Sequence, residues 1–185
     1  MKDIAIYGAG GFGREVVCLL NRTNEIEPEW NFIGFIDDGK NVDDENEYGR
    51  ILGGIDYLNS YSQELNVVIA IGSPHRVAAI ISKISNDNIV FPNIYAPNLR
   101  FADSKNVQIG KGNIFSWDCH VSCNVLIGDF NAFNGNVIIG HDSVIGNYNS
   151  FMPGVHISGE TIIGNENYFG VSSIVLQKKK VGNNT

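Results

Sequence analysis

The stretch IGDFNAFNGNVIIGHDSVIG, residues 127–146, carries a six-residue repeat of large apolar side chains. The repeat begins at Ile109 and continues to Val181, with an isoleucine, valine or phenylalanine at every sixth position. An α-helix cannot use this period, because six residues at 100° each do not return to one face. Three short strands wound as a coil can, since each strand then points one apolar side chain to a shared axis. The stretch therefore predicts a parallel β-helix.

A longer period of eighteen residues indicates that three strands make one triangular coil. Glycine follows the apolar residue once per coil, phenylalanine occupies a second apolar position, and asparagine recurs at a fixed place, as in an amide ladder at a turn. Four coils fit between residues 109 and 180. These three series are Gly110, Gly128, Gly146, Gly164 and Gly182; Phe115, Phe133, Phe151 and Phe169; and Asn113, Asn131, Asn149 and Asn167.

Composition excludes several classes of function. The net charge of −7 over 185 residues argues against nucleic acid as the main partner, because phosphate binding needs a basic face. No apolar run approaches the roughly 20 residues of a membrane span, and the first residues carry no signal-peptide pattern. Three cysteines fit a reduced, cytoplasmic protein. Cys119, His120 and Cys123 lack a second pair of ligands, so we expect no metal site.

The N-terminal part begins with a strand over residues 4–7 that runs into GAGGFG, residues 8–13, and then a helix over residues 14–21. This is a G-x-G-x-x-G motif in its proper context, with a strand before it and a helix after it. Glycines there let the backbone approach a phosphate at the helix N-terminus. The candidate substrate-binding glycines are Gly8, Gly10, Gly11 and Gly13.

Two further strands place more candidate substrate-binding residues at the same edge. Residues 32–36 end in Asp37 and Asp38, whose position after the glycines suits hydrogen bonds to a ribose or base. Residues 67–71 end at Gly72 and Ser73, before a helix that Pro74 begins. One βαβαβ half of this size is enough for one nucleotide but not for a full dinucleotide site. The alternative is that the glycines only make a tight turn.

Two prolines in the segment of residues 91–97 indicate a stiff join between the halves. We therefore expect an α/β, Rossmann-like half domain at residues 1–92 and a β-helix at residues 93–185.

The two halves in this order resemble the hexapeptide-repeat nucleotide-sugar acetyltransferases, through the segments GAGGFG, FIDD, AIGSPHR and IIGHDSVIGNY. The resemblance implies a left-handed β-helix and a homotrimer with active sites between neighbouring subunits. It also implies acetyl-CoA as the donor, and a nucleotide-linked amino sugar that the N-terminal domain holds.

Within this resemblance, His141 is the candidate general base, because acyl transfer to an amine needs a group that removes the amine proton. Gly159 lies eighteen residues on, one coil higher on the same edge, where its N–H is a candidate donor to the thioester oxygen and part of the cofactor site. Asp142 is expected to orient the imidazole. Because adjacent strand residues point to opposite faces, a role for Asp142 across the subunit boundary is the equal alternative.

The resemblance implies further site residues. Asn134 matches a polar residue near the acceptor, and Gly170 and Val171 are expected to flank the pantetheine arm. Ser150 stands where many members have a second histidine, and its expected role is a hydrogen bond to the cofactor. The chain stops a few residues into a fifth coil, where the resemblance implies one more coil and a tail against CoA, so the β-helix domain is expected to be cut short.

Three functions remain open at this point. The leading one is N-acetylation of a nucleotide-linked 4-amino sugar for surface glycan biosynthesis. The second keeps the fold and acetylates a sugar hydroxyl, as in sialic acid O-acetylation. The third is a nucleotide-binding structural module that has lost CoA binding. A zinc-dependent hydratase is rejected, because the spacing of His120, His141 and His156 does not place two imidazoles on one corner.

Overall fold

The computed structural model describes residues 1–185 and divides into two compact units. The first unit comprises Met1–Gly72 with Arg76–Pro92, and the second comprises Ser73–His75 with Asn93–Thr185. No helix is both long enough and apolar enough to cross a membrane. Each unit is described by itself below.

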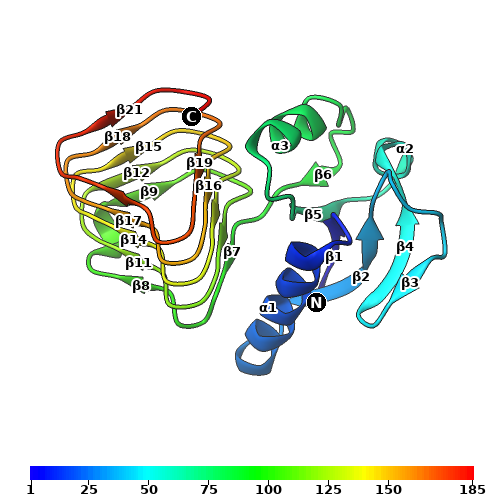
Figure 1. Ribbon diagram of the computed structural model, residues 1–185. Helices are drawn as coiled ribbons and strands as arrows, with labels where there is room; N and C mark the ends of the chain where they lie inside the picture. The colour runs from blue at the N-terminus through cyan, green and yellow to red at the C-terminus, as the bar shows by residue number, and fades with distance from the viewer. The chain divides into compact units, whose positions relative to one another are not determined.

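The first unit is built on a six-stranded sheet in the order β3-β4-β2-β1-β5-β6 (Figure 1). All neighbouring strands are parallel except β3, which pairs antiparallel with β4 at one edge. The chain moves outward from β1 through β2 to β4 and then returns to the other side of β1 with β5, so a topological switch point lies between β1 and β5. The strands are β1 (Lys2–Tyr7), β2 (Trp30–Ile36), β3 (Glu45–Asn46), β4 (Gly49–Gly53), β5 (Leu65–Ile69) and β6 (Ile89–Val90).

Three helices connect these strands: α1 (Gly11–Ile26), α2 (Ile55–Ser60) and α3 (Pro74–Ile81). The buried stripe of α1 consists of Val16, Val17, Leu19 and Leu20, as expected for an amphipathic helix that packs on a sheet. The third predicted strand lies two residues earlier than expected, at β5. Neither β4 nor α2 was predicted from the sequence, because the intervening residues show no clear hydrophobic period.

The second unit is a left-handed parallel β-helix, as the sequence and the resemblance predicted (Figure 1). Its short strands form three five-stranded parallel sheets, which we call faces. The first face contains β7 (Ile94–Tyr95), β10 (Ile114–Phe115), β13 (Ala132–Phe133), β16 (Ser150–Phe151) and β19 (Tyr168–Phe169). The second contains β8 (Arg100–Phe101), β11 (His120–Val121), β14 (Ile138–Ile139), β17 (His156–Ile157) and β20 (Ile174–Val175). The third contains β9 (Val107–Ile109), β12 (Val125–Ile127), β15 (Val144–Ile145), β18 (Ile162–Ile163) and β21 (Lys180–Val181).

The interior of the β-helix consists of the predicted apolar stacks. Phe115, Phe133 and Phe151 are fully buried, and consecutive rings in the phenylalanine stack lie 4.4–4.8 Å apart between centroids. That spacing matches the separation of neighbouring strands in a sheet, so each ring packs flat on the next.

The β-helix begins one coil before the six-residue repeat becomes visible. Tyr95 pairs with Phe115 and Phe101 with Val121, which makes this first coil twenty residues long at those positions. The two additional residues fall at the corner that contains the short 3-10 helix η1 (Ser104–Asn106). This insertion hides the period in the sequence while leaving the pairing of the strands intact.

The asparagine ladder lies inside one corner and is fully hydrogen-bonded. Asn113, Asn131, Asn149 and Asn167 are each at most 1 % exposed. The Oδ1 atom of Asn149 accepts from the backbone N–H and the Nδ2 of Asn167 at 2.9 and 3.0 Å, while its own Nδ2 donates to Asn131 and to the carbonyl of Gly164. The ladder thus ties each coil to the next where the backbone leaves the sheet.

We expect Asn149→Ala to lower the free energy of unfolding by about 2–4 kcal/mol, because it leaves several buried polar groups without partners. Urea denaturation followed by circular dichroism measures this loss. The matched control is Asn136→Ala, which removes an exposed asparagine at a corner with a left-handed φ of 59° and is expected to cost about 1 kcal/mol. Equal losses in the two variants would contradict a structural role for the ladder.

Candidate functional site

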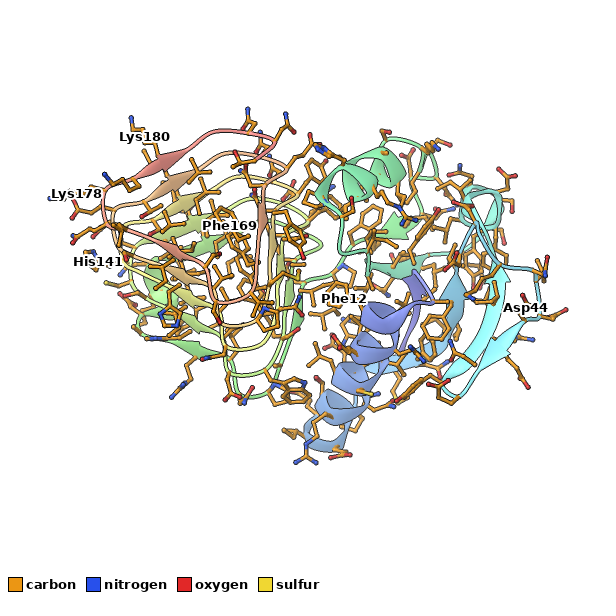
Figure 2. All side chains as sticks on the ribbon, viewed as in Figure 1. Phe12, Asp44, His141, Phe169, Lys178 and Lys180 are labelled. Atoms are coloured by element: carbon orange, nitrogen blue, oxygen red, sulfur yellow. The ribbon has the colours of Figure 1, made fainter.

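His141 and Gly159 are vertical neighbours on one corner of the β-helix. Strands β14 and β17 pair Ile139 with Ile157. His141 and Gly159 each come two residues after these paired positions, so they lie at equivalent places in successive coils. A Cβ atom on Gly159 would lie 2.6 Å from His141 Nε2, closer than any real contact of that kind. A side chain at position 159 would therefore force the imidazole out of the place that it occupies over the next coil. Figure 2 shows His141 at the outer surface of the β-helix, where its side chain is 48 % exposed.

Asp142 contacts the imidazole within the same protomer. Its Oδ2 lies 2.7 Å from His141 Nδ1. The two residues occupy a turn rather than a strand, and Asp142 has a left-handed φ of 56°, so the strand rule that sends adjacent side chains to opposite faces does not apply. Of the two alternatives for Asp142, the structure shows the contact with its own neighbour.

A second side chain also holds the Asp142 carboxylate. Asn124 Nδ2 donates a short hydrogen bond to Asp142 Oδ1 from one coil below. This bond, followed by the bond to His141, lowers the pKa of Asp142 below its ordinary value. An ionised carboxylate can only accept, so Nδ1 of a neutral His141 must carry the proton and Nε2 is left with a free lone pair. The tautomer that results is the one that a base at Nε2 requires.

The backbone N–H of Gly159 makes no hydrogen bond within the chain, although its carbonyl accepts from Lys178 N at 3.1 Å. The corner thus presents an imidazole nitrogen with a free lone pair beside an unpaired N–H donor. A base next to a donor is the pair of groups that acyl transfer uses.

The other predicted residues of the β-helix site lie elsewhere in the protomer. We call the corner between the second and third faces the His141 corner, and the corner between the first and second faces the Asn134 corner. Asn134, Gly170 and Val171 all lie on the Asn134 corner, where Gly170 and Val171 are exposed. Ser150 lies in β16 on the first face and is 2 % exposed, so its hydroxyl does not face solvent. One protomer therefore brings His141, Asp142 and Gly159 together but leaves the remaining four residues apart from them.

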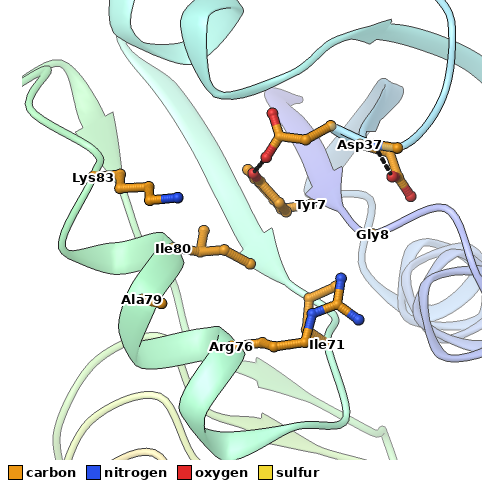
Figure 3. Close-up of a pocket in the computed structure, with 10 residues that line it drawn as sticks. Tyr7, Gly8, Asp37, Ile71, Arg76, Ala79, Ile80 and Lys83 are labelled. Carbon is orange, nitrogen blue, oxygen red and sulfur yellow. Dashed lines mark hydrogen bonds between the residues drawn. The ribbon is translucent and has the colours of Figure 1, made fainter.

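The first unit contains a pocket of about 290 Å³ at the switch point between β1 and β5 (Figure 3). Of the predicted substrate-binding residues, Gly8, Asp37 and Asp38 line it. Arg76 and Lys83 also line it and bring two cationic side chains to a cavity that already contains two acids. Gly10 lines a second pocket, together with Ala9 and Arg14. The other predicted residues line neither pocket: Gly11, Gly13, Gly72 and Ser73.

Both acids of the pocket are tied to the loop and helices around them. Asp37 accepts from the backbone N–H groups of Ala9 and Gly39 at 3.0 Å, which fixes the glycine loop against the end of β2. Asp38 accepts from the Tyr7 hydroxyl and, at 2.7 Å, from the N–H of Ile55 at the start of α2. Each carboxylate oxygen retains acceptor capacity, so these acids both shape the pocket and remain able to bind a ligand donor.

The glycines of the G-x-G-x-x-G motif serve two different purposes. Gly8 has a φ of 107°, and a Cβ on Gly13 would lie 1.8 Å from the carbonyl oxygen of Gly8, so these two glycines permit the close contact of strand and helix. Gly10 and Gly11 have open space where a Cβ would be. Gly10 is the N-cap of α1 and offers no side-chain hydrogen bond, so the N–H groups of the first turn stay available to an anion.

Sequence reasoning missed three residues that take part in these sites. Tyr7 was assigned only to a strand, yet burial and then the hydrogen bond to Asp38 raise its pKa, which keeps the hydroxyl protonated as a donor. Lys83 gave no signal, because it lies in an ordinary helical pattern. Asn124 could have been found from the repeat, since it precedes Asp142 by one full coil.

No group of three or more histidine, cysteine, aspartate or glutamate side chains is arranged to hold a metal ion.

Comparisons with known proteins agree on the architecture. Residues 3–84 match the PglD N-terminal domain family. The chain superposes on the acetyltransferase domain of PglB from Neisseria gonorrhoeae FA1090, determined in complex with acetyl coenzyme A, with a TM-score of 0.83, 24% identity, and coverage of 98% of this chain and 85% of that one. It also matches WeeI from Acinetobacter baumannii AYE (TM-score 0.74, 25% identity, coverage 98% and 94%).

A more distant match is PerB from Caulobacter crescentus, in complex with CoA and GDP-perosamine (TM-score 0.63, 16% identity, coverage 98% and 92%). No curated protein matches the chain in sequence. Residues 3–84 of the first unit thus match the PglD N-terminal domain, and the whole chain shares the fold of the PglB acetyltransferase domain and of PerB. These matches confirm the resemblance to sugar acetyltransferases that the sequence predicted.

Two glycines of one motif should respond differently to the same substitution. We expect Gly13→Ala to lower the free energy of unfolding by at least about 3 kcal/mol, because its Cβ would meet backbone that cannot move away. Gly10→Ala, with open space at the Cβ and an extended backbone, should change stability by no more than about 0.5 kcal/mol. Thermal denaturation of the two variants measures the difference, and a stable Gly13→Ala protein would contradict this account of the loop.

Proposed function

We propose that this chain transfers an acetyl group from acetyl-CoA to the amine of a nucleotide-linked 4-amino sugar, for surface glycan biosynthesis. The observation that carries the proposal is the His141 corner, where the imidazole lies between the Asp142 carboxylate and the backbone of Gly159. The acetyl coenzyme A complex of the PglB domain and the GDP-perosamine complex of PerB support the two substrate classes.

In the proposed reaction His141 Nε2 takes the proton of the sugar amine as the amine nitrogen attacks the thioester carbonyl. The new C–N bond forms while negative charge develops on the thioester oxygen, and the Gly159 N–H donates to that oxygen. The C–S bond then breaks, and the proton held on the imidazole passes to the departing CoA thiolate. Asp142 stabilises the imidazolium during these steps and keeps the ring in position.

The pocket lined by Asp37 and Asp38, together with the glycine loop beside it, is the proposed site for the nucleotide part of the sugar substrate. Gly10 and Gly11 leave the N-terminus of α1 open to a phosphate, and Arg76 and Lys83 supply positive charge in the pocket. Asp37 and Asp38 can accept hydrogen bonds from a ribose or base. This combination suits a nucleoside diphosphate better than an uncharged ligand.

We propose a homotrimer, because the residues of the proposed site lie on two different corners. Asn134, Gly170 and Val171 cannot reach His141 within one protomer, but a partner packed along the third face would bring its Asn134 corner beside the first protomer's His141 corner. The third face adjoins the His141 corner and exposes an apolar column of Leu126, Val144 and Ile162, each about 40 % accessible. Such a column on a sheet surface favours burial against a second copy. Ser150 is not included in the proposed site.

The test of the function is release of CoA thiol from acetyl-CoA in the presence of a panel of UDP- and GDP-linked 4-amino sugars, with 4-hydroxy sugars and sialic acid as comparisons. We expect turnover with an amino sugar. Turnover only with hydroxyl acceptors would establish O-acetylation instead. Binding of a nucleotide sugar without any binding of acetyl-CoA would favour the structural module.

We expect His141→Ala to lower kcat by about 10²-fold or more, because it removes the general base. The corner is exposed, so the melting temperature should stay within a few degrees of the wild type. Steady-state kinetics and calorimetry on the same preparation measure both quantities. Unchanged turnover in this variant would remove His141 from the mechanism.

Active sites shared between subunits predict complementation between inactive variants. His141→Ala and Asn134→Ala, each impaired alone, should regain activity when they are unfolded together and reassembled as mixed trimers. In a random mixture about a quarter of the sites combine an intact His141 with an intact Asn134 from the neighbour. Mixed trimers without regained activity, after light scattering has established the assembly, would place the whole site within one protomer.

A further inference from the structure

The corner position that follows His141 forms a vertical series of polar residues through four successive coils. Asn124, Asp142, Glu160 and Lys178 occupy it from one coil to the next, and all four have left-handed φ values between 56° and 62°. The series is divided into two pairs. In the lower pair, Asn124 donates to Asp142. In the upper pair, Lys178 Nζ lies 3.6 Å from Glu160 Oε1, which also accepts from Gln177 Nε2 at 2.8 Å.

This pairing decides which way each carboxylate points. Asp142 and Glu160 occupy the same position in neighbouring coils, and two carboxylates without other partners would repel each other there. Glu160 is engaged by Gln177 and Lys178 from above, whereas Asp142 is engaged by Asn124 from below. The titratable group in contact with Asp142 is His141, while Glu160 and Lys178 occupy the next two places of the series and Cys123 precedes Asn124 in the chain.

We propose that Asn124 is a positioning residue for the general base: its amide fixes Asp142 Oδ1 and so directs Oδ2 at His141 Nδ1. This inference rests on the proposed function, because it gives Asn124 a part in that same site. Asn124 touches neither substrate in this scheme and acts only through Asp142. The two bonds to Asp142 use different oxygens, so one does not displace the other.

An amide suits this position for two reasons. It offers N–H donors without charge, and asparagine tolerates a left-handed backbone better than most residues. The donated bond favours the ionised form of Asp142, consistent with the lowered pKa of that carboxyl. An aspartate at position 124 would instead place a second carboxylate against Asp142 and favour its protonation.

The β-helix contains the same contact where there is no histidine. Asn98 Nδ2 donates to Asp118 Oδ1 at 2.9 Å on the Asn134 corner, and Asp118 also has a left-handed φ, of 60°. The residue that precedes Asp118 is Trp117, which has no base to orient. An asparagine–aspartate bond can thus stabilise a corner alone, and Asn98 is a matched control for Asn124.

The experiment compares Asn124→Ala, Asn124→Asp and Asn98→Ala with the wild type. We expect Asn124→Ala to lower kcat roughly 5- to 20-fold with KM for both substrates within about twofold, and Asn124→Asp to lower it further. Asn98→Ala should leave kcat unchanged. A decrease of kcat in Asn124→Ala no greater than in Asn98→Ala would overturn the proposal.

A double-mutant cycle separates positioning from a general loss of structure. If Asn124 acts through Asp142, adding Asn124→Ala to Asp142→Ala should cause no further loss of kcat. Fully additive losses would show that Asn124 acts by another route.

A measurement without substrates keeps this inference distinct from the proposed function. The carboxyl carbon of Asp142, followed by NMR during a pH titration, should titrate at higher pH in Asn124→Ala than in the wild type and be unchanged in Asn98→Ala. That shift without any acetyl transfer by the wild type would contradict the proposed function alone. Absence of the shift would overturn the role of Asn124 whatever the activity.

Discussion

The structure of the β-helix depends on one constraint, the vertical alignment of identical positions in successive coils. Backbone hydrogen bonds join each coil to the next, as from Ile114 N to Asn131 O at 2.9 Å, and each interior side chain lies directly on its counterpart. Flat stacking of phenylalanine rings and continuous asparagine hydrogen bonding both require that counterparts be of the same kind. The repeat in the sequence is the direct consequence of this alignment.

The same alignment explains how the proposed active corner forms on a fold of such regularity. The interior stacks hold the backbone of neighbouring coils at a fixed separation, and the corner residues inherit it. The interior packing alone therefore brings His141 over Gly159. The one further requirement at this corner is that position 159 carries no side chain. The left-handed turn then brings Asp142 back to the ring, so a single corner holds the candidate base, the acid beside it and, one coil higher, the candidate donor.

Much of this could be predicted from the sequence, because the evidence for it is periodic. The interior stacks, the asparagine ladder and the vertical relation of His141 to Gly159 all follow from counting residues. What could not be predicted depends on the direction of side chains at turns. The contact of Asp142 with its own neighbour needs a positive φ, which no period reveals. The pocket residues Tyr7 and Lys83 are brought together by the order of strands β1 and β5 and the packing of α3, which have no counterpart in the local pattern.

The two additional residues at η1 have a consequence for how such a protein can change. They lengthen a corner without shifting the strands on either side, since Phe101 still pairs with Val121 and Ile109 with Ile127. Insertions at the corners of the β-helix therefore leave the pairing of strands on its faces unchanged. Loops of new composition can therefore be inserted at these corners while the paired strands continue to stabilise the fold.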